Sequence, residues 1–144
     1  MAEAATATWI LTMLGGAYLF AKVSRFGRSP QEMQHTRWPS SVLFAHPVLA
    51  GAGFVAWLVY LNSDEEGMAW VSLGTLVLTA LLGSYLWVRS LGRDRTVVVP
   101  SAPGEEGLVR TGLAEHELPD LAVHAHGAVA ALTMLLVLLT ALND

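Results

Sequence analysis

Two histidines stand at the start of a segment that is otherwise apolar enough to lie in lipid. The segment LAVHAHGAVAALTMLLVLLTAL covers residues 121–142 and carries His124 and His126. A third histidine, His46, has a similar place in an earlier apolar segment, SSVLFAHPVLAGAGFVAWLVYL. Ionisable side chains inside a bilayer are costly and usually serve a function. Imidazole nitrogens bind iron, zinc and copper, so these three positions are candidate metal or cofactor ligands.

The elements that must position these histidines are apolar helices. The chain has 144 residues, of which 53% are hydrophobic and 14% are charged, well below the roughly 25% charged residues of soluble domains. Four segments contain no Asp, Glu, Lys or Arg and approach the ~20 residues that cross a bilayer: residues 4–21, 41–61, 68–88 and 121–142. We therefore predict an all-α, four-helix transmembrane bundle, with residues 1–144 forming one membrane domain in the lipid bilayer. Glu3 precedes the first segment and the basic residues follow it, which favours an uncleaved helix over a signal peptide.

The basic residues predict the orientation of the bundle. All eight lie on two connections, between the first and second segments and between the third and fourth: Lys22, Arg25, Arg28, Arg37, Arg89, Arg93, Arg95 and Arg110. The connection 62–67 is acidic. Positively charged loops stay in the cytoplasm, so we expect the loop 89–120 to be cytoplasmic and the N- and C-termini to be extracytoplasmic. The expected location is the cell membrane, as a multi-pass protein of the bacterial inner membrane.

This orientation brings histidines from two helices to one depth. The second and fourth helices would both run outward from the cytoplasm, so His46 lies at the level of His124 and His126. Residues two apart on a helix point about 200° away from each other, so one of the pair faces the common axis. The stripe through His124 continues with small residues: Gly127, Ala128 and Ala131. We therefore expect His124 to face inward and His126 to matter less.

Two imidazoles that face each other over small side chains suit haem b, whose iron takes two axial nitrogens. The predicted axial ligands are His46 and His124, with His126 as the alternative. Three further residues are expected at the cytoplasmic end, where they could bind the haem propionates: Arg37, Arg89 and Arg93. The chain has no cysteine, so the haem would be held without covalent attachment.

Other functions remain open. His46, His124 and His126 could instead form a histidine-only metal site, and histidines near helix ends also form simple interhelical hydrogen bonds. A cofactor-free structural or assembly subunit of a larger membrane complex is the second function considered. A small metal or solute transporter is less favoured, because no charged residue lies within any span. Enzymatic activity stays undecided, because the chain shows no nucleophile–base pair and no phosphate-binding loop. A basic patch with interleaved aromatic residues is also missing, so no nucleic-acid partner is expected.

The stretches FAHPVLAGAG and LAVHAHGAVAA, on the second and fourth of four spans, resemble those of small membrane b-type cytochromes. The chain also looks like one half of the haem A synthase fold and is similar in plan to haem-carrying membrane anchors of respiratory dehydrogenases. The resemblance implies electron transfer between a quinone and a redox partner such as a respiratory complex. It also implies that His46 and His124 are axial ligands. The cytoplasmic level of the histidines departs from haem A synthase, so that activity is not expected. No clear internal repeat is visible; the two halves share little beyond a histidine early in each second span.

Overall fold

The computed structural model describes residues 1–26, 38–63, 65–91, 96–100, 108–112 and 118–143. These residues form four helices and one antiparallel pair of strands: α1 (Ala2–Phe26), α2 (Ser40–Ser63), α3 (Glu66–Ser90), β1 (Thr96–Pro100), β2 (Leu108–Gly112) and α4 (Asp120–Asn143). Each of the four helices is long and apolar enough to cross a membrane. The predicted architecture of four helices, each able to span a membrane, is therefore confirmed, with helices that extend slightly beyond the predicted segments.

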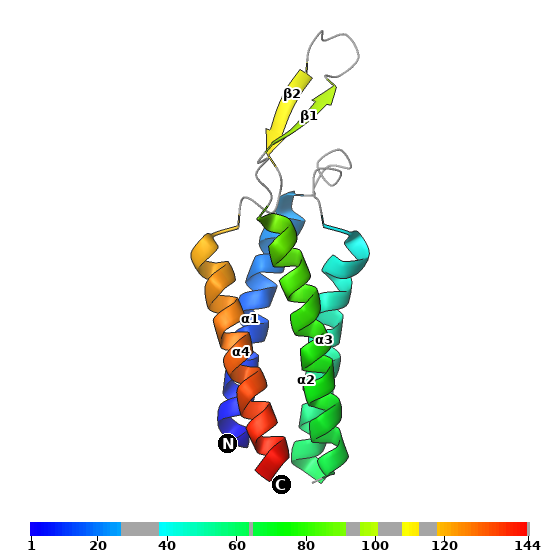
Figure 1. The fold of residues 1–144 in the computed structure, drawn as a ribbon, viewed down its shortest axis with the longest axis vertical. Coiled ribbons are helices and arrows are strands. Elements are labelled where there is room, and N and C mark those ends of the chain that lie inside the picture. The colour runs from blue at the N-terminus through cyan, green and yellow to red at the C-terminus, as the bar shows by residue number, and fades with distance from the viewer. Residues whose placement is uncertain (27–37, 64, 92–95, 101–107, 113–117, 144) are drawn as a thin grey trace.

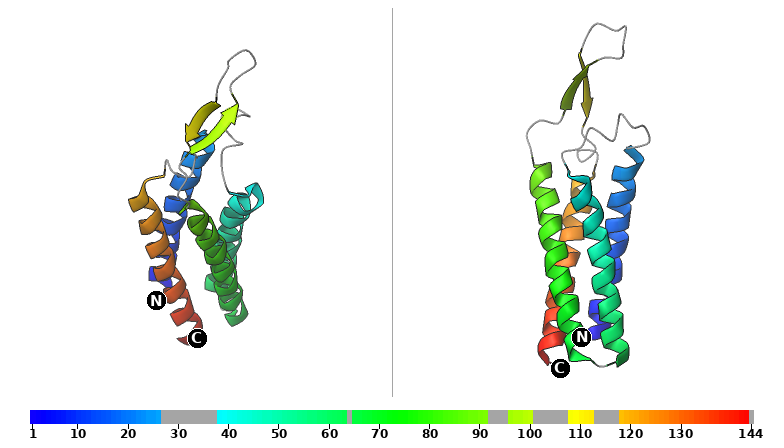
Figure 2. Two further views of the ribbon diagram at one scale, coloured as in Figure 1. Left: turned by 45° about the horizontal axis from the view of Figure 1, so that its top comes forward. Right: turned by 90° about the vertical axis from the view of Figure 1, so that its right-hand side faces the viewer.

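The helices run side by side, and both chain termini lie at one end of the bundle (Figure 1). Strands β1 and β2 project from the opposite end (Figure 2). We call these two ends the terminal end and the hairpin end. The closest helix pairs are α2 with α3 and α1 with α4, whereas α1 and α2 touch least among neighbours. The order around the bundle is therefore α1, α2, α3, α4, with α2 diagonally opposite α4.

Helices α2 and α4 begin in the same way at the hairpin end. The carbonyl of Pro39 accepts hydrogen bonds from the Val42 and Leu43 amides, each at 3.0 Å. The carbonyl of Pro119 does the same at the start of α4, at 2.9 and 3.1 Å. Proline suits this position because a helix start leaves its first amides unpaired in any case. Each proline stands seven residues before a histidine, His46 or His126, which places both imidazoles in the second turn.

A cluster of aromatic side chains fills the terminal half of the bundle. Trp57 is fully buried, and its Nε1 donates a 2.8 Å hydrogen bond to Oγ1 of Thr6 on α1. Trp9 packs against it with ring centres 6.3 Å apart. Gly53 lets these elements approach, because an added Cβ would lie 3.1 Å from the Thr75 Cβ and 3.3 Å from Cζ2 of Trp9.

A smaller cluster closes the hairpin end. It contains Val23, Trp38 and Leu86, all buried. The indole Nε1 of Trp38 donates to the Leu86 carbonyl at 3.0 Å, so the short segment before α2 is fixed onto the end of α3. The early turns of α2 and α4, which carry the histidines, lie between these two clusters along the bundle.

Candidate functional site

The side chains of His46 and His126 meet inside the bundle. Their ring centres are 6.3 Å apart and the ring planes are inclined by 69°. One histidine comes from α2 and the other from the diagonally opposite α4, and both are half-buried. Histidines of these two helices therefore lie close together at one level of the bundle, as the sequence predicts.

The expectation that His124 is the inward-facing member of its pair is wrong. His124 is exposed, and its Nδ1 donates to the Asp120 carbonyl of its own helix at 2.7 Å. Its ring lies edge-on to Trp87, with centres 6.2 Å apart. The small residues of its stripe, Gly127, Ala128 and Ala131, are all exposed, whereas the stripe of His126 continues into the buried Thr133 and Val137. Small side chains favour the inner face in the sequence-based prediction, yet on α4 they lie mainly on the outer face.

Helix α3 holds His46 in position. Nδ1 of His46 lies 3.0 Å from the Thr79 carbonyl oxygen. A carbonyl can only accept, so Nδ1 carries the proton and Nε2 keeps its lone pair. The ring also packs against Gly83, where an added Cβ would stand 2.9 Å from Cε1 of the imidazole. Any larger residue at this position would therefore displace His46.

Helix α1 receives His126 through two glycines. A Cβ on Gly16 would lie 3.1 Å from Cε1 of His126, and a Cβ on Gly15 would lie 3.4 Å from its Nδ1. Nδ1 is buried and has no hydrogen bond of good geometry, although His126 also interacts with the backbone of Thr12. The two histidines thus have similar surroundings, and they differ in hydrogen bonding.

These similar surroundings reflect a weak repeat that relates the two halves of the sequence. Residues 12–22 read TMLGGAYLFAK and residues 79–89 read TALLGSYLWVR, with five identities in eleven positions. In the aligned halves Gly16 corresponds to Gly83. Gly16 packs against His126, and Gly83 packs against His46. The segments that lead to the two histidines also correspond. PSSVLFAH, which ends at His46, and PDLAVHAH, which ends at His126, share their first proline, their last alanine and their final histidine.

Two further contacts occur at equivalent positions of the two halves. Phe20 packs edge-on against Phe44, with centres 5.7 Å apart, as Trp87 packs against His124. His124 therefore stands where the first half has an outward-facing phenylalanine. The site lies where the two halves meet, so each half contributes one imidazole and one glycine to it. Comparing the two segments directly would have identified His126 as the counterpart of His46.

The arginines predicted to bind propionates are only partly described. Arg89 is exposed at the hairpin end, and its Cζ lies 5.7 Å from the ring centre of Tyr85. In the other half Lys22 has the same relation to Tyr18, at 5.9 Å. Arg37 and Arg93 lie outside the described residues.

The histidine-only metal site is not formed. Within the part of the chain that the structure describes, no group of three or more His, Asp or Glu side chains could hold a metal ion. The reason is the outward orientation of His124, which leaves His46 and His126 as a pair.

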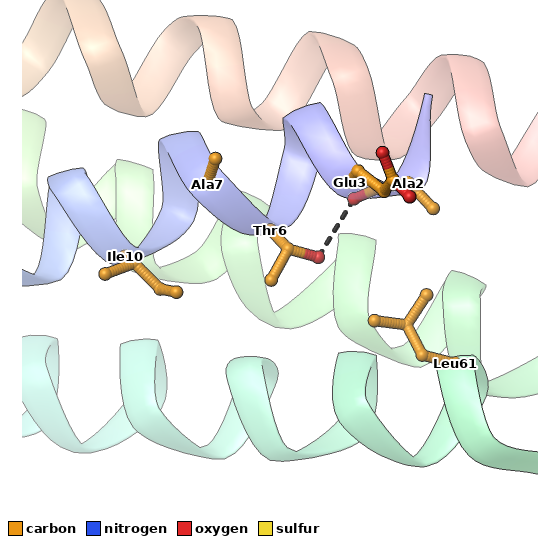
Figure 3. A pocket seen from close by; sticks show the side chains of 6 residues that line it. All are labelled: Ala2, Glu3, Thr6, Ala7, Ile10 and Leu61. Carbon is orange, nitrogen blue, oxygen red and sulfur yellow. Dashed lines mark hydrogen bonds between the residues drawn. The ribbon is translucent and has the colours of Figure 1, made fainter.

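A separate shallow depression lies between α1 and α2 at the terminal end (Figure 3). It is open, and its lining is largely apolar: Ala2, Glu3, Thr6, Ala7, Ile10 and Leu61. Thr6 Oγ1 donates to the Ala2 carbonyl at 2.9 Å, so this hydroxyl is already satisfied. The depression offers no set of converging polar groups, and the histidine pair remains the better candidate.

The comparisons with known proteins add no relative. No family model matches the chain, and no curated protein and no solved structure shows significant similarity to it.

Proposed function

We propose that the protein is a membrane electron-transfer protein that binds one non-covalent haem b between His46 and His126. The observation that carries the proposal is the pair of half-buried imidazoles inside the bundle, with ring centres 6.3 Å apart. His126 replaces His124 as the second axial ligand, because His124 is turned outward.

The spacing of the two rings suits a shared iron. A metal–imidazole nitrogen bond is about 2.0–2.1 Å long and the nitrogen lies about 1 Å from the ring centre, so two axial imidazoles have centres about 6 Å apart. The observed separation is 6.3 Å. The 69° between the ring planes is compatible with this arrangement, because an axial imidazole can rotate about its bond to the iron.

The hydrogen bonding of His46 also favours a ligand role. Metal-binding histidines usually donate their second ring N–H to a carboxylate or backbone carbonyl, which fixes the ring and its tautomer. The bond from His46 Nδ1 to the Thr79 carbonyl, at 3.0 Å, does this and leaves Nε2 available to iron.

The small residues on the other two helices are the third supporting feature. A porphyrin lies perpendicular to the axis that joins its two axial ligands, so its edges would point toward the other diagonal of the bundle, α1 and α3. At this level those helices carry Gly16 and Gly83. Both glycines keep side-chain volume out of this level of the bundle, so that the two imidazoles pack directly against the backbones of α1 and α3.

The position of the pair suggests the direction of electron exchange. The histidines lie in the second turn of α2 and α4, toward the hairpin end. One haem there cannot carry electrons across the ~30 Å core by itself. We therefore propose exchange with a quinone in the bilayer or with a respiratory complex alongside. The positive-inside rule would put the hairpin end in the cytoplasm and both termini outside, in the cell membrane of a bacterium.

Optical spectra of single variants test the ligand assignment. The reduced wild-type protein should show sharp, low-spin b-type bands. His46→Ala and His126→Ala should each lose or alter these bands, whereas His124→Ala should keep them. Reduction of the bound haem by a short-chain quinol in proteoliposomes tests the electron-transfer role. Haem bands that survive removal of both His46 and His126 would refute the site, and a haem that quinols cannot reduce would refute quinone exchange.

A further inference from the structure

We propose that His126 is the exchangeable one of the two axial ligands, and that its release opens a binding position for a neutral diatomic gas such as carbon monoxide or nitric oxide. This inference rests on the proposed haem site. It follows from the places where the two halves of the repeat differ, because in an exact repeat both histidines would be held equally.

The first difference is a hydrogen bond. His46 donates from Nδ1 to the Thr79 carbonyl at 3.0 Å, whereas the buried Nδ1 of His126 makes no bond of equally good geometry, although the backbone of Thr12, the counterpart of Thr79, lies beside it. Such outer contacts orient the ligand and raise its basicity, and losing one typically costs about 10- to 100-fold in metal affinity. His126 is therefore the weaker ligand.

The second difference is the space beside each ring. In the aligned halves of the repeat Gly15 corresponds to Leu82, just as Gly16 corresponds to Gly83. Gly15 lies against His126, with 3.4 Å between an added Cβ and Nδ1 of the imidazole. The His126 ring thus packs against a glycine at the position where the other half of the repeat has a leucine, so this residue has no side chain that could hold the imidazole.

The third difference is the backbone after each histidine. Pro47 follows His46 within α2, whereas Gly127 follows His126. Proline fixes its own backbone dihedral angle, and glycine leaves the backbone most free. An added Cβ on Gly127 would meet no atom within 4 Å, so neighbouring side chains do not restrain this turn of α4.

The ligand exchange is balanced without any further reactant. With haem bound, His126 would release the iron from Nε2 and keep its electron pair, and the carbon of carbon monoxide would donate its own lone pair to the ferrous iron in its place. No electron or proton would be transferred, and His46 would hold the iron throughout.

Carbon monoxide binding to the purified, reduced full-length protein is the test. Wild-type protein should convert slowly to the carbon monoxide form, limited by release of His126. His126→Ala should keep its haem in a high-spin form and bind carbon monoxide at least about tenfold faster, in line with removal of a competing ligand. His46→Ala should retain less haem than His126→Ala.

Gly15→Ala gives an independent measurement that leaves both ligands in place. The new Cβ makes an ordinary contact with Nδ1 of His126 and should slow carbon monoxide binding several-fold. Gly127→Ala, at an open position, should slow it less. A wild-type protein that holds haem but never binds carbon monoxide, or a His46→Ala variant that keeps haem better than His126→Ala, would overturn the inference and leave the haem site standing. A wild-type protein without haem would overturn the proposed function itself.

Discussion

The substitution Gly83→Ala should separate haem binding from helix formation. An added Cβ would stand 2.9 Å from Cε1 of His46, closer than such contacts occur, so the imidazole must move. Overpacking of this kind costs about 1–3 kcal/mol. Moving the ring also breaks its hydrogen bond to the Thr79 carbonyl, which adds about 0.5–1.5 kcal/mol. Haem affinity should therefore fall by about one to three orders of magnitude, at 1.4 kcal/mol for each factor of ten.

Gly74→Ala is the matched control, because Gly74 lies on the same helix and an added Cβ there would meet no atom within 4 Å. Alanine favours a helix over glycine by about 1 kcal/mol, so this variant should bind haem normally and melt at an equal or higher temperature. The assay is titration of the haem-free protein in detergent, followed by absorbance, with thermal unfolding measured in parallel. Equal haem affinity in Gly83→Ala and wild type would refute the reasoning, and so would an equal loss in Gly74→Ala.

Other predictions address the second ligand, the core and the topology. Gly16→Ala should also weaken haem binding, but less than Gly83→Ala, because its Cβ would lie 3.1 Å from the ring of His126; the same titration measures it. Trp57→Phe and Thr6→Val each remove one partner of the 2.8 Å bond between α2 and α1, and each should lower stability by about 1 kcal/mol; a double variant whose loss equals the sum would contradict that contact. His124→Phe should leave spectrum and stability nearly unchanged, since this exposed position corresponds to a phenylalanine in the first half. Cysteines placed in the 62–67 connection should react with impermeant reagents from outside the cell, and labelling only from the cytoplasmic side would reverse the proposed topology.

The helices could be predicted from the sequence because lipid imposes a simple constraint. Every spanning segment must be apolar over about 20 residues, and the four predicted segments lie within the four observed helices. The depth of the histidines along their helices could also be predicted from the sequence, because it depends only on the number of residues from the helix start. Both starts are marked by a proline, Pro39 and Pro119.

The rotation of α4 could not be predicted by the same means. Around a membrane helix both lipid-facing and protein-facing positions are apolar, so hydrophobic periodicity is weak. Small residues on α4 suggested that His124 faces inward, whereas contacts with Gly15 and Gly16 turn His126 inward. The signal that could have resolved the choice was the repeat, in which His126 corresponds to His46 and His124 to Phe44.

The most direct test of the central claim is the iron and haem content of the wild-type protein, purified after expression with ample haem supply. Two opposed imidazoles at 6.3 Å predict one haem b per chain, six-coordinate and low-spin in both oxidation states, with sharp bands on reduction. A correctly folded, helical protein that carries no Soret band and no iron under these conditions would contradict the account.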